Sequence, residues 1–298
     1  MTDPASSTRR PRILSLQSQV AYGHVGNSAA VFALQRRSID VISLPTALLS
    51  HHPGHGAPAG VATDAGLLGQ MTASLQKLPV FREIDGVLTG YIGAADQAPV
   101  LAEIVDAVRA ANPKAIYICD PVLGDEPKGI YVDEARAAAI ADTLVPKADI
   151  ITPNLFELQR LAGGAPKTLT EIAEAAKGLA PETVVTSTAP GTASAIAVAG
   201  GRAWRAEGPF TAGAPPSGLG DLFTAVYAGA RLWGQEAPSA LAEAVGAVAA
   251  IAEESADADE MRLVAGQHRL HRPHPAVTVA EAGQDRRDDT SGAPKEHS

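Results

Sequence analysis

The short stretch Gly218-Leu219-Gly220-Asp221 combines residue types that could handle a phosphate group. Glycines let the backbone bend and let a ligand approach closely. An apolar run of helical character follows at once, and a helix start presents unpaired N–H groups that suit a phosphate. Asp221 would be placed there to accept a proton from an attacking hydroxyl. The simpler interpretation is a plain loop with Asp221 as an N-cap, and these four residues alone favour it.

Further acidic and amide side chains follow apolar segments elsewhere in the chain. Asp120 and Asp125 flank a short loop, and Asn154 stands three residues before Glu157, in the first turn of one predicted helix. Phosphoryl transfer uses Mg²⁺, which takes oxygen ligands, often through water. Each residue also has a structural explanation, as a turn before proline, an N-cap or a partner of the helix dipole. Their combination with Asp221 is harder to explain by structure alone.

A histidine-rich loop, His51-His52-Pro53-Gly54-His55-Gly56, is a second candidate for metal binding. Imidazoles are common ligands of transition metals. No acidic ligand lies close by in the sequence, and proline and glycine mark an exposed turn. We therefore favour an exposed turn over a metal site, because short motifs often match by chance.

Segments of strand and helix character alternate along most of the chain. Strands are predicted at 13–16, 39–44, 86–90, 115–119, 149–152 and 183–186, with a hairpin at 193–199 and 202–207. Helices are predicted at 28–36, 62–78, 98–111, 132–144, 154–161, from a capping box at 168–171, after 221, at 239–255 and at 259–271. This alternation predicts an α/β fold with a mostly parallel central sheet and helices on both faces.

Polar residues follow the predicted strands at their carboxyl ends, which is where ligands bind in open parallel sheets. The strand ends carry Gln17-Ser18, Gly90-Tyr91, Asp120, Thr152-Pro153-Asn154 and Thr186-Ser187. Such groups at one sheet edge, together with the helix start at Asp221, predict an active site there. The sequence has no internal repeat, and it lacks the P-loop and the dinucleotide-binding glycine fingerprints, which disfavours those two classes of nucleotide site.

Length and charge narrow the classes of function. The 298 residues are 46% hydrophobic, enough for a large core, and the net charge of −9 argues against nucleic acid as a partner. Cys119 is the only cysteine, which excludes an intrachain disulfide and fits a reducing cytoplasm. No apolar run reaches the roughly 18 residues of a membrane span, so we expect no membrane partner. We expect residues 1–11 to be flexible, without a signal peptide, and residues 280–298 to form a disordered tail.

These segments resemble the pyridoxal kinase family of the ribokinase-like superfamily. The resemblance covers residues 12–272 and is carried by the segments 17–30, 88–91, 119–125, 150–157 and 218–221. It implies a three-layer sandwich and the ATP-dependent phosphorylation of the 5′-hydroxymethyl group of pyridoxal, pyridoxine or pyridoxamine, a reaction of vitamin B6 salvage. It also implies Mg²⁺, a monovalent cation such as K⁺, a homodimer and a cytoplasmic location.

The resemblance assigns roles to the matching residues. Asp221 would be the base on the substrate hydroxyl, and the main-chain amides of Gly218, Leu219 and Gly220 would bind the transferred phosphoryl group. Asp120 and Glu157 would organise Mg²⁺ and its water. Further contacts would come from Asn154 and Asp125 beside the phosphates, from Thr186 and Ser187 in the nucleotide site, and from Ser18, His52 and Tyr91 around the pyridine ring. The segment 124–131 would be a lid that closes over ATP.

The chain departs from the usual family pattern at three places. Leu219 stands where the family commonly has threonine, which keeps the main-chain N–H but loses a hydroxyl contact to phosphate. Pro53 stands where relatives often have threonine, which puts one ring contact in doubt. Some relatives carry a lid cysteine that captures the pyridoxal aldehyde, whereas Ile130 occupies that place here. Cys119 ends a strand instead, so we expect no covalent hemithioacetal.

Two alternative functions remain open. A hydroxymethylpyrimidine kinase would act on a similar heteroaromatic alcohol, although the segment 22–27 favours a vitamin B6 kinase. A catalytically weak carrier of pyridoxal phosphate belongs to a different class, and the presence of Asp221, both glycines, Asp120 and Glu157 argues against it. A panel of substrates distinguishes the three.

Overall fold

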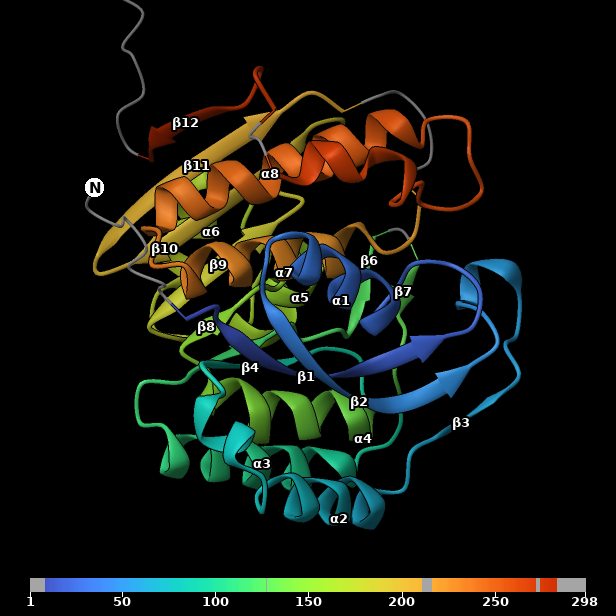
Figure 1. Cartoon of the computed structure of the whole chain (residues 1–298). Coiled ribbons are helices and arrows are strands. Elements are labelled where there is room, and N and C mark those ends of the chain that lie inside the picture. Colours follow the sequence, from blue (N-terminus) through green and yellow to red (C-terminus); the bar gives the residue numbers. More distant parts are fainter. Residues whose placement is uncertain (1–8, 127, 211–215, 272–273, 283–298) are drawn as a thin grey trace, which may run out of the picture.

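The computed structural model describes residues 9–126, 128–210, 216–271 and 274–282, and its centre is one sheet of ten strands (Figure 1). The strand order is β12-β11-β10-β9-β8-β5-β4-β1-β2-β3. Strands β9, β8, β5, β4, β1 and β2 pair in parallel, and the strands toward both edges pair antiparallel. The bounds are β1 Arg12–Val20, β2 Asp40–Leu49, β3 Gly60–Ala62, β4 Gly86–Thr89, β5 Ile116–Cys119, β8 Ile150–Ile151, β9 Glu182–Thr186, β10 Ala193–Ala199, β11 Arg202–Gly208 and β12 Thr278–Glu281.

Helices cover both faces of this sheet. One face carries α1 Asn27–Arg36, α7 Leu219–Leu232 and α8 Ala237–Glu254, and the other carries α2 Ala65–Leu75, α3 Gln97–Ala111, α4 Glu134–Ala139, α5 Leu155–Ala162 and α6 Leu169–Ala176. Successive residues of a strand point to opposite faces. Leu88 therefore packs in the core beneath α1, α7 and α8, whereas Val87 packs in the core beneath α2, α3 and α4.

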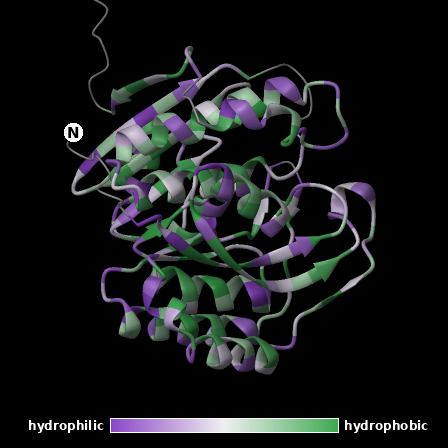
Figure 2. Ribbon diagram, in the orientation of Figure 1, coloured by the Kyte–Doolittle hydropathy of each residue, from purple (hydrophilic) through white to green (hydrophobic). Residues whose placement is uncertain are grey.

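Packing of the cores on the two faces of the sheet explains why hydrophobic residues recur at strand and helix spacing in the sequence. Figure 2 shows hydrophobic residues along the central strands and running through the helices on both sides of the sheet. Among the described residues no helix combines the length and the hydropathy needed to span a membrane. The arrangement confirms the expected α/β three-layer sandwich with a mostly parallel central sheet.

Strand β1 is longer than predicted, because its polar residues are buried and paired. The sequence predicts a stop at Gln17, yet β1 continues to Val20 beside β2. The Gln17 side chain donates to Ser15 Oγ at 3.0 Å, and the Asn27 side chain donates to the Gln17 carbonyl at 3.0 Å. Internal hydrogen bonds remove the cost of burying these groups, so polar residues need not end the strand.

Several helix boundaries also differ from the prediction. The segment 62–78 begins with the end of β3 before α2, and the segment 132–144 is α4 followed by a π-turn at Ile140–Leu144. The segment 259–271 contains only a 3₁₀ turn, Ala265–His271. The hairpin of β10 and β11 and the capping box before α6 are confirmed. Strand β12 was not predicted; it pairs with β11, while residues 283–298 lie outside the described residues.

Candidate active site

The parallel strands bring polar residues from distant parts of the chain to one edge of the sheet. Main-chain hydrogen bonds continue just past the strands: the Asp120 N–H donates to the Thr89 carbonyl at 2.9 Å, and the Thr152 N–H donates to the last carbonyl of β5 at 3.1 Å. Asn154 forms an isolated parallel bridge with Thr186 at the end of β9. The strand ends therefore lie side by side, in the order that the sheet imposes.

Helix α7 begins at the two glycines in front of Asp221. Gly218 is the N-cap, with a φ of 95° that favours glycine. A Cβ at Gly218 would lie 1.9 Å from the His24 carbonyl oxygen, whereas a Cβ at Gly220 would meet no atom of the described residues within 4 Å. Gly218 thus allows the tight turn, and Gly220 leaves open space. The first N–H groups of a helix have no intrahelical acceptor, so an open helix start of this kind suits an anion.

The carboxylate of Asp221 lies in this first turn and is half-buried. Burial raises its pKa from 3.8 to about 6, and hydrogen bonds from the main chain of Gly26 and of Asp221 itself lower it in part. Gly26 adopts a φ of 53°, and a Cβ there would lie 2.4 Å from the Ser18 carbonyl oxygen. The turn before α1 can therefore bring its amide to Asp221 only with glycine at position 26. A carboxylate with a pKa near 6 is ionised at neutral pH and still basic enough to take a proton.

Asp120 is a second carboxylate at this edge and is more deeply buried, with 8% of its surface exposed. Its pKa is raised well above the ordinary value of 3.8, first by burial and then by repulsion from Glu157 and Asp221. A hydrogen bond from Thr224 works in the opposite direction. A buried carboxylate that two other carboxylates repel favours a bound cation or proton.

Asn154 and Glu157 form a capping box at the start of α5. Glu157 is 3% exposed, and its two oxygens accept main-chain N–H groups from Asn154 at 2.9 Å and from Leu123 at 2.8 Å. Burial raises the pKa of Glu157 to about 8, although the N–H groups of Asn154, Leu123 and Gly124 oppose the shift. The carboxylate is fixed in place by the backbone of two separate segments.

The segment proposed as a lid forms a small hairpin of its own. Strands β6 Gly124–Asp125 and β7 Gly129–Ile130 pair antiparallel, and the Asn154 side chain donates to the Gly124 carbonyl at 2.7 Å. A Cβ at Gly124 would lie 2.3 Å from the Gly129 carbonyl oxygen, so the hairpin needs glycine there. Asp125 lies 3.7 Å from Lys128 in an exposed ion pair. The hairpin is therefore attached to the same capping residue as α5.

The residues after β9 and the single cysteine are also placed at this edge. Ser187 is exposed, with a φ of 57°, and its N–H donates to the Ser194 carbonyl at 3.0 Å. Thr186, next to it, is half-buried. Cys119 is fully buried, and burial raises the pKa of its thiol to about 12. The thiolate that would attack an aldehyde is therefore not populated at neutral pH.

Two of the residues assigned to the pyridine ring are held by protein contacts. Ser18 is buried in β1 against Gly26. The Tyr91 hydroxyl accepts a hydrogen bond from Arg136 at 2.8 Å, and the Arg136 guanidinium also lies over the Tyr91 ring. No hydrogen bond among the described residues joins Tyr91 to the three site carboxylates.

His52, the third of these residues, is buried rather than exposed. Its Nδ1 accepts the Gly54 N–H at 3.1 Å, and its Nε2 lies 2.7 Å from Glu260 Oε1. His55 Nε2 contacts the same oxygen, so the fold supplies the acidic neighbour that the local sequence lacks. The three side chains could in principle hold a metal ion. Because Nδ1 of His52 accepts a hydrogen bond, Nε2 carries the hydrogen and donates it, which does not suit a metal ligand.

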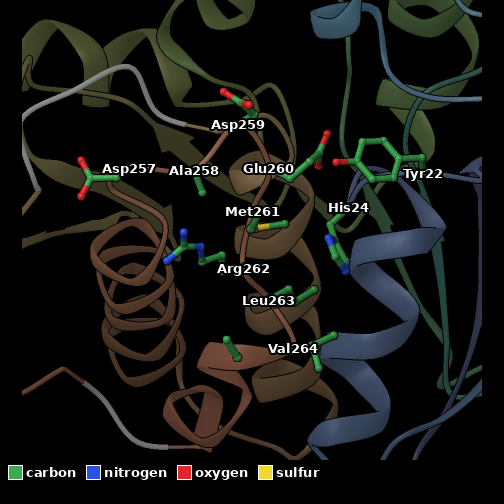
Figure 3. Close-up of a pocket in the computed structure, with 11 residues that line it drawn as sticks. Tyr22, His24, Asp257, Ala258, Asp259, Glu260, Met261, Arg262, Leu263 and Val264 are labelled. Carbon is green, nitrogen blue, oxygen red and sulfur yellow. The ribbon is translucent and has the colours of Figure 1, made fainter.

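Glu260 also borders a shallow pocket of about 490 Å³ (Figure 3). Figure 3 shows Tyr22 and His24 on one side of this pocket and the segment that carries Glu260 and Met261 on the other. The Met261 side chain would lie 3.1 Å from a Cβ at Gly218. The pocket is therefore next to the start of α7.

Two residues of the site region were missed by sequence reasoning. Thr224 donates to Asp120, and its position three residues after Asp221 was the only available signal. Glu260 contacts His52 across 208 residues, and nothing in the local sequence points to that pairing. Both contacts depend on packing between segments, which periodicity does not reveal.

Relatives of this chain are found over most of its length. A family profile described as phosphomethylpyrimidine kinase matches residues 70–264. The chain is 35% identical over 287 residues to pyridoxal kinase PdxY of Deinococcus radiodurans, covering 91% of this chain and 96% of that protein. It is 39% identical over 272 residues to pyridoxal kinase PdxY of Rubrobacter xylanophilus, covering 88% and 94%.

The fold is also similar to that of a solved enzyme. Pyridoxal kinase from Leishmania donovani, in complex with ADP and pyridoxamine, superposes with a TM-score of 0.84 at 28% identity, covering 91% of this chain and 99% of that one. Sequence identity and fold thus agree over nearly the whole length of the relatives. This chain belongs to the pyridoxal kinase family.

Proposed function

We propose that this chain transfers the γ-phosphoryl group of ATP to the 5′-hydroxymethyl group of pyridoxal, pyridoxine and pyridoxamine, yielding the 5′-phosphate and ADP. The observation that carries the proposal is the position of Asp221. Its carboxylate, with a pKa of about 6, lies in the first turn of α7, immediately after Gly218 and Gly220. Base and phosphate-binding amides are thus adjacent, as phosphoryl transfer to an alcohol requires.

In the proposed reaction, Asp221 takes the proton of the substrate hydroxyl while the oxygen of that hydroxyl forms a bond to the γ-phosphorus. The bond between that phosphorus and the β,γ-bridging oxygen breaks, and ADP leaves with the electron pair. The amides of Gly218, Leu219 and Gly220 stabilise the negative charge on the transferred group. Leu219 lacks the hydroxyl of a threonine, so this stabilisation comes from the main chain alone.

Mg²⁺ fits the acidic residues beside this site. Asp120 and Glu157 offer hard oxygen donors, and both carboxylates carry pKa values that burial has raised. Both Glu157 oxygens accept main-chain N–H groups, which favours a role through metal-bound water. When bound, Mg²⁺ would neutralise phosphate charge. The protein would contribute the fixed orientation of the two carboxylates.

The remaining roles follow the family resemblance. Asn154 and Asp125 would lie beside the phosphates, and Thr186 and Ser187 would line the nucleotide site. The hairpin 124–131 would close over ATP and exclude water. K⁺ as a second cation, a homodimeric assembly and a cytoplasmic location belong to the same proposal.

The substrate side would be formed by Ser18, His52 and Tyr91. Both ring nitrogens of His52 are already occupied, by Gly54 and Glu260. The ring of His52 would therefore offer the pyridine a packing surface rather than a hydrogen bond.

A second candidate function is the phosphorylation of hydroxymethylpyrimidine, favoured by the description of the matching family profile. We would test both by incubating the chain with ATP, Mg²⁺ and K⁺ and each of pyridoxal, pyridoxine, pyridoxamine and hydroxymethylpyrimidine. The expected result is turnover of the vitamin B6 compounds with kcat/KM well above that for the pyrimidine. Preferred turnover of the pyrimidine would replace the proposal with the second candidate. Tight binding of pyridoxal phosphate without turnover of any compound would instead support a carrier.

A further inference from the structure

Thr224 reaches the carboxylate of Asp120 from helix α7. Its Oγ1 lies 3.1 Å from Asp120 Oδ2 and donates to it across 104 residues of sequence. Both side chains are buried, with 2% and 8% of their surfaces exposed. Thr224 follows Asp221 by three residues, so the two lie on the same side of α7. One helix therefore carries both the proposed base and the group that holds Asp120.

A second hydroxyl extends this contact. Thr152 Oγ1 lies 2.9 Å from Thr224 Oγ1 and is also buried. A threonine hydroxyl has one hydrogen to donate. Because Thr224 gives its hydrogen to Asp120, Thr152 is the donor to Thr224. The resulting chain runs from the end of β8 through α7 to the end of β5, and each bond polarises the next.

Packing alone does not call for a hydroxyl at position 224. Its neighbours along α7, Phe223, Ala225 and Val226, are buried and apolar. Valine has nearly the shape of threonine and would fill the same space without burying a polar group. Asp120, in contrast, needs a donor, because a buried carboxylate oxygen without a partner bears its full desolvation cost.

We propose that Thr224 is a positioning residue for the metal at Asp120. By holding Oδ2 it fixes the orientation of the carboxylate and leaves Oδ1, for which the described residues provide no hydrogen bond, available to Mg²⁺ or its water. This inference rests on the proposed function, since it takes Asp120 as a Mg²⁺ residue. It adds a link between Asp120, the proposed Mg²⁺ residue, and α7, the helix that carries the proposed base Asp221.

The test is calorimetric titration of Mg²⁺ into the full chain saturated with ADP, for the unchanged protein, Thr224→Val and Thr224→Ser. Thr183→Val is the matched control, because Thr183 Oγ1 is buried and has no hydrogen-bond partner among the described residues. We expect Thr224→Val to bind Mg²⁺ about tenfold more weakly, as for a lost hydrogen bond to a charged group. Thr224→Ser and Thr183→Val should bind within about twofold of the unchanged chain, by the same reasoning. The KM for pyridoxal should stay the same in all four proteins.

Mg²⁺ binding by folded Thr224→Val equal to that of the unchanged chain would overturn this inference alone. Should that variant not fold, Thr224→Ala provides the same comparison without added bulk. A loss of Mg²⁺ affinity in Thr224→Ser equal to that in Thr224→Val would also contradict the inference, because serine keeps the hydroxyl. Absence of Mg²⁺ binding by the unchanged chain would overturn the metal role of Asp120 and this inference with it.

Discussion

Asn154 and Glu157 hold each other at the start of α5, each accepting the main-chain N–H of the other at 2.9 Å. The second oxygen of Glu157 accepts the Leu123 N–H at 2.8 Å, in the segment that leads into the β6-β7 hairpin. A motif that elsewhere only caps a helix here also joins that helix to the proposed lid. It thereby fixes a buried carboxylate in the proposed metal site.

Replacement of Glu157 by glutamine should weaken the response to Mg²⁺ while preserving the shape of the side chain. Removing one buried negative charge beside the cation should raise the Mg²⁺ concentration for half-maximal activity by at least about tenfold. The measurement is the rate of pyridoxal phosphorylation as a function of Mg²⁺ at saturating ATP.

Glu171 offers a matched control, because it forms the same capping box with Thr168 on an exposed helix start. Glu171→Gln should leave the Mg²⁺ response unchanged. Equal Mg²⁺ responses in Glu157→Gln and Glu171→Gln would mean that Glu157 is only a cap.

The two glycines before Asp221 should separate into a structural one and a functional one. In the part of the chain that the structure describes, the Cβ of Gly220→Ala meets no atom within 4 Å. Alanine in a helix is favoured over glycine by roughly 0.5–1 kcal/mol, so stability should not fall. Its methyl group would occupy the space in front of the helix, and kcat/KM for ATP should drop about tenfold or more. Thermal unfolding and kinetics of the same preparation check both expectations.

Gly218→Ala should behave in the opposite way. Its Cβ would lie 1.9 Å from the His24 carbonyl oxygen, and its φ of 95° is strained for alanine. We expect a loss of about 1–3 kcal/mol or more in the free energy of unfolding. A stable Gly218→Ala, or a Gly220→Ala that unfolds early, would contradict the roles assigned to these glycines.

The pH dependence of catalysis should follow the ionisation of the Asp221 carboxylate. Burial raises its pKa to about 6, and only the ionised form can accept the substrate proton. The value of kcat/KM for pyridoxal should therefore fall as pH decreases through about 6 and level off above it. Initial rates between pH 5 and pH 8 test this. A profile that stays flat down to pH 5 would exclude a base with the pKa given for Asp221.

The raised pKa of Asp221 also predicts that its ionised carboxylate destabilises the fold at alkaline pH. Because its pKa is raised from 3.8 to about 6, the folded chain favours the protonated form, and that stabilisation is lost as pH rises through about 6. Asp221→Asn should therefore have a higher Tm than the unchanged chain at pH 8, and the difference should shrink toward pH 5. Thermal unfolding at both pH values measures it. A lower Tm for the variant at pH 8 would contradict the prediction that the ionised Asp221 carboxylate destabilises the fold.

The sequence predicted the fold and the neighbouring positions of the polar strand ends well, because both follow from local patterns. Alternating strands and helices place Asp120, Thr152 and Thr186 at the carboxyl ends of parallel strands. The end of β1 was predicted less well. Gln17 is polar in sequence but is buried in a hydrogen-bonded group with Ser15, so the composition of the segment misrepresents its environment.

Contacts between distant segments could not be predicted. Thr224 finds Asp120, and Glu260 finds His52, only after α7 and the segment that follows α8 have packed. Hydrophobic periodicity gives the face of a helix but not the partner of one polar atom on that face. The burial of His52 was hidden for the same reason, since its loop carries the proline and glycine typical of an exposed turn.

The central claim is that this chain phosphorylates pyridoxal with Asp221 as the base. The most direct measurement is the rate at which the unchanged chain and Asp221→Asn form pyridoxal 5′-phosphate from pyridoxal and ATP with Mg²⁺ and K⁺. We predict turnover by the unchanged chain and a kcat that is roughly two to four orders of magnitude lower in Asp221→Asn, the usual contribution of a general base. Equal rates for the two proteins, or no pyridoxal phosphate from the unchanged chain, would contradict the account.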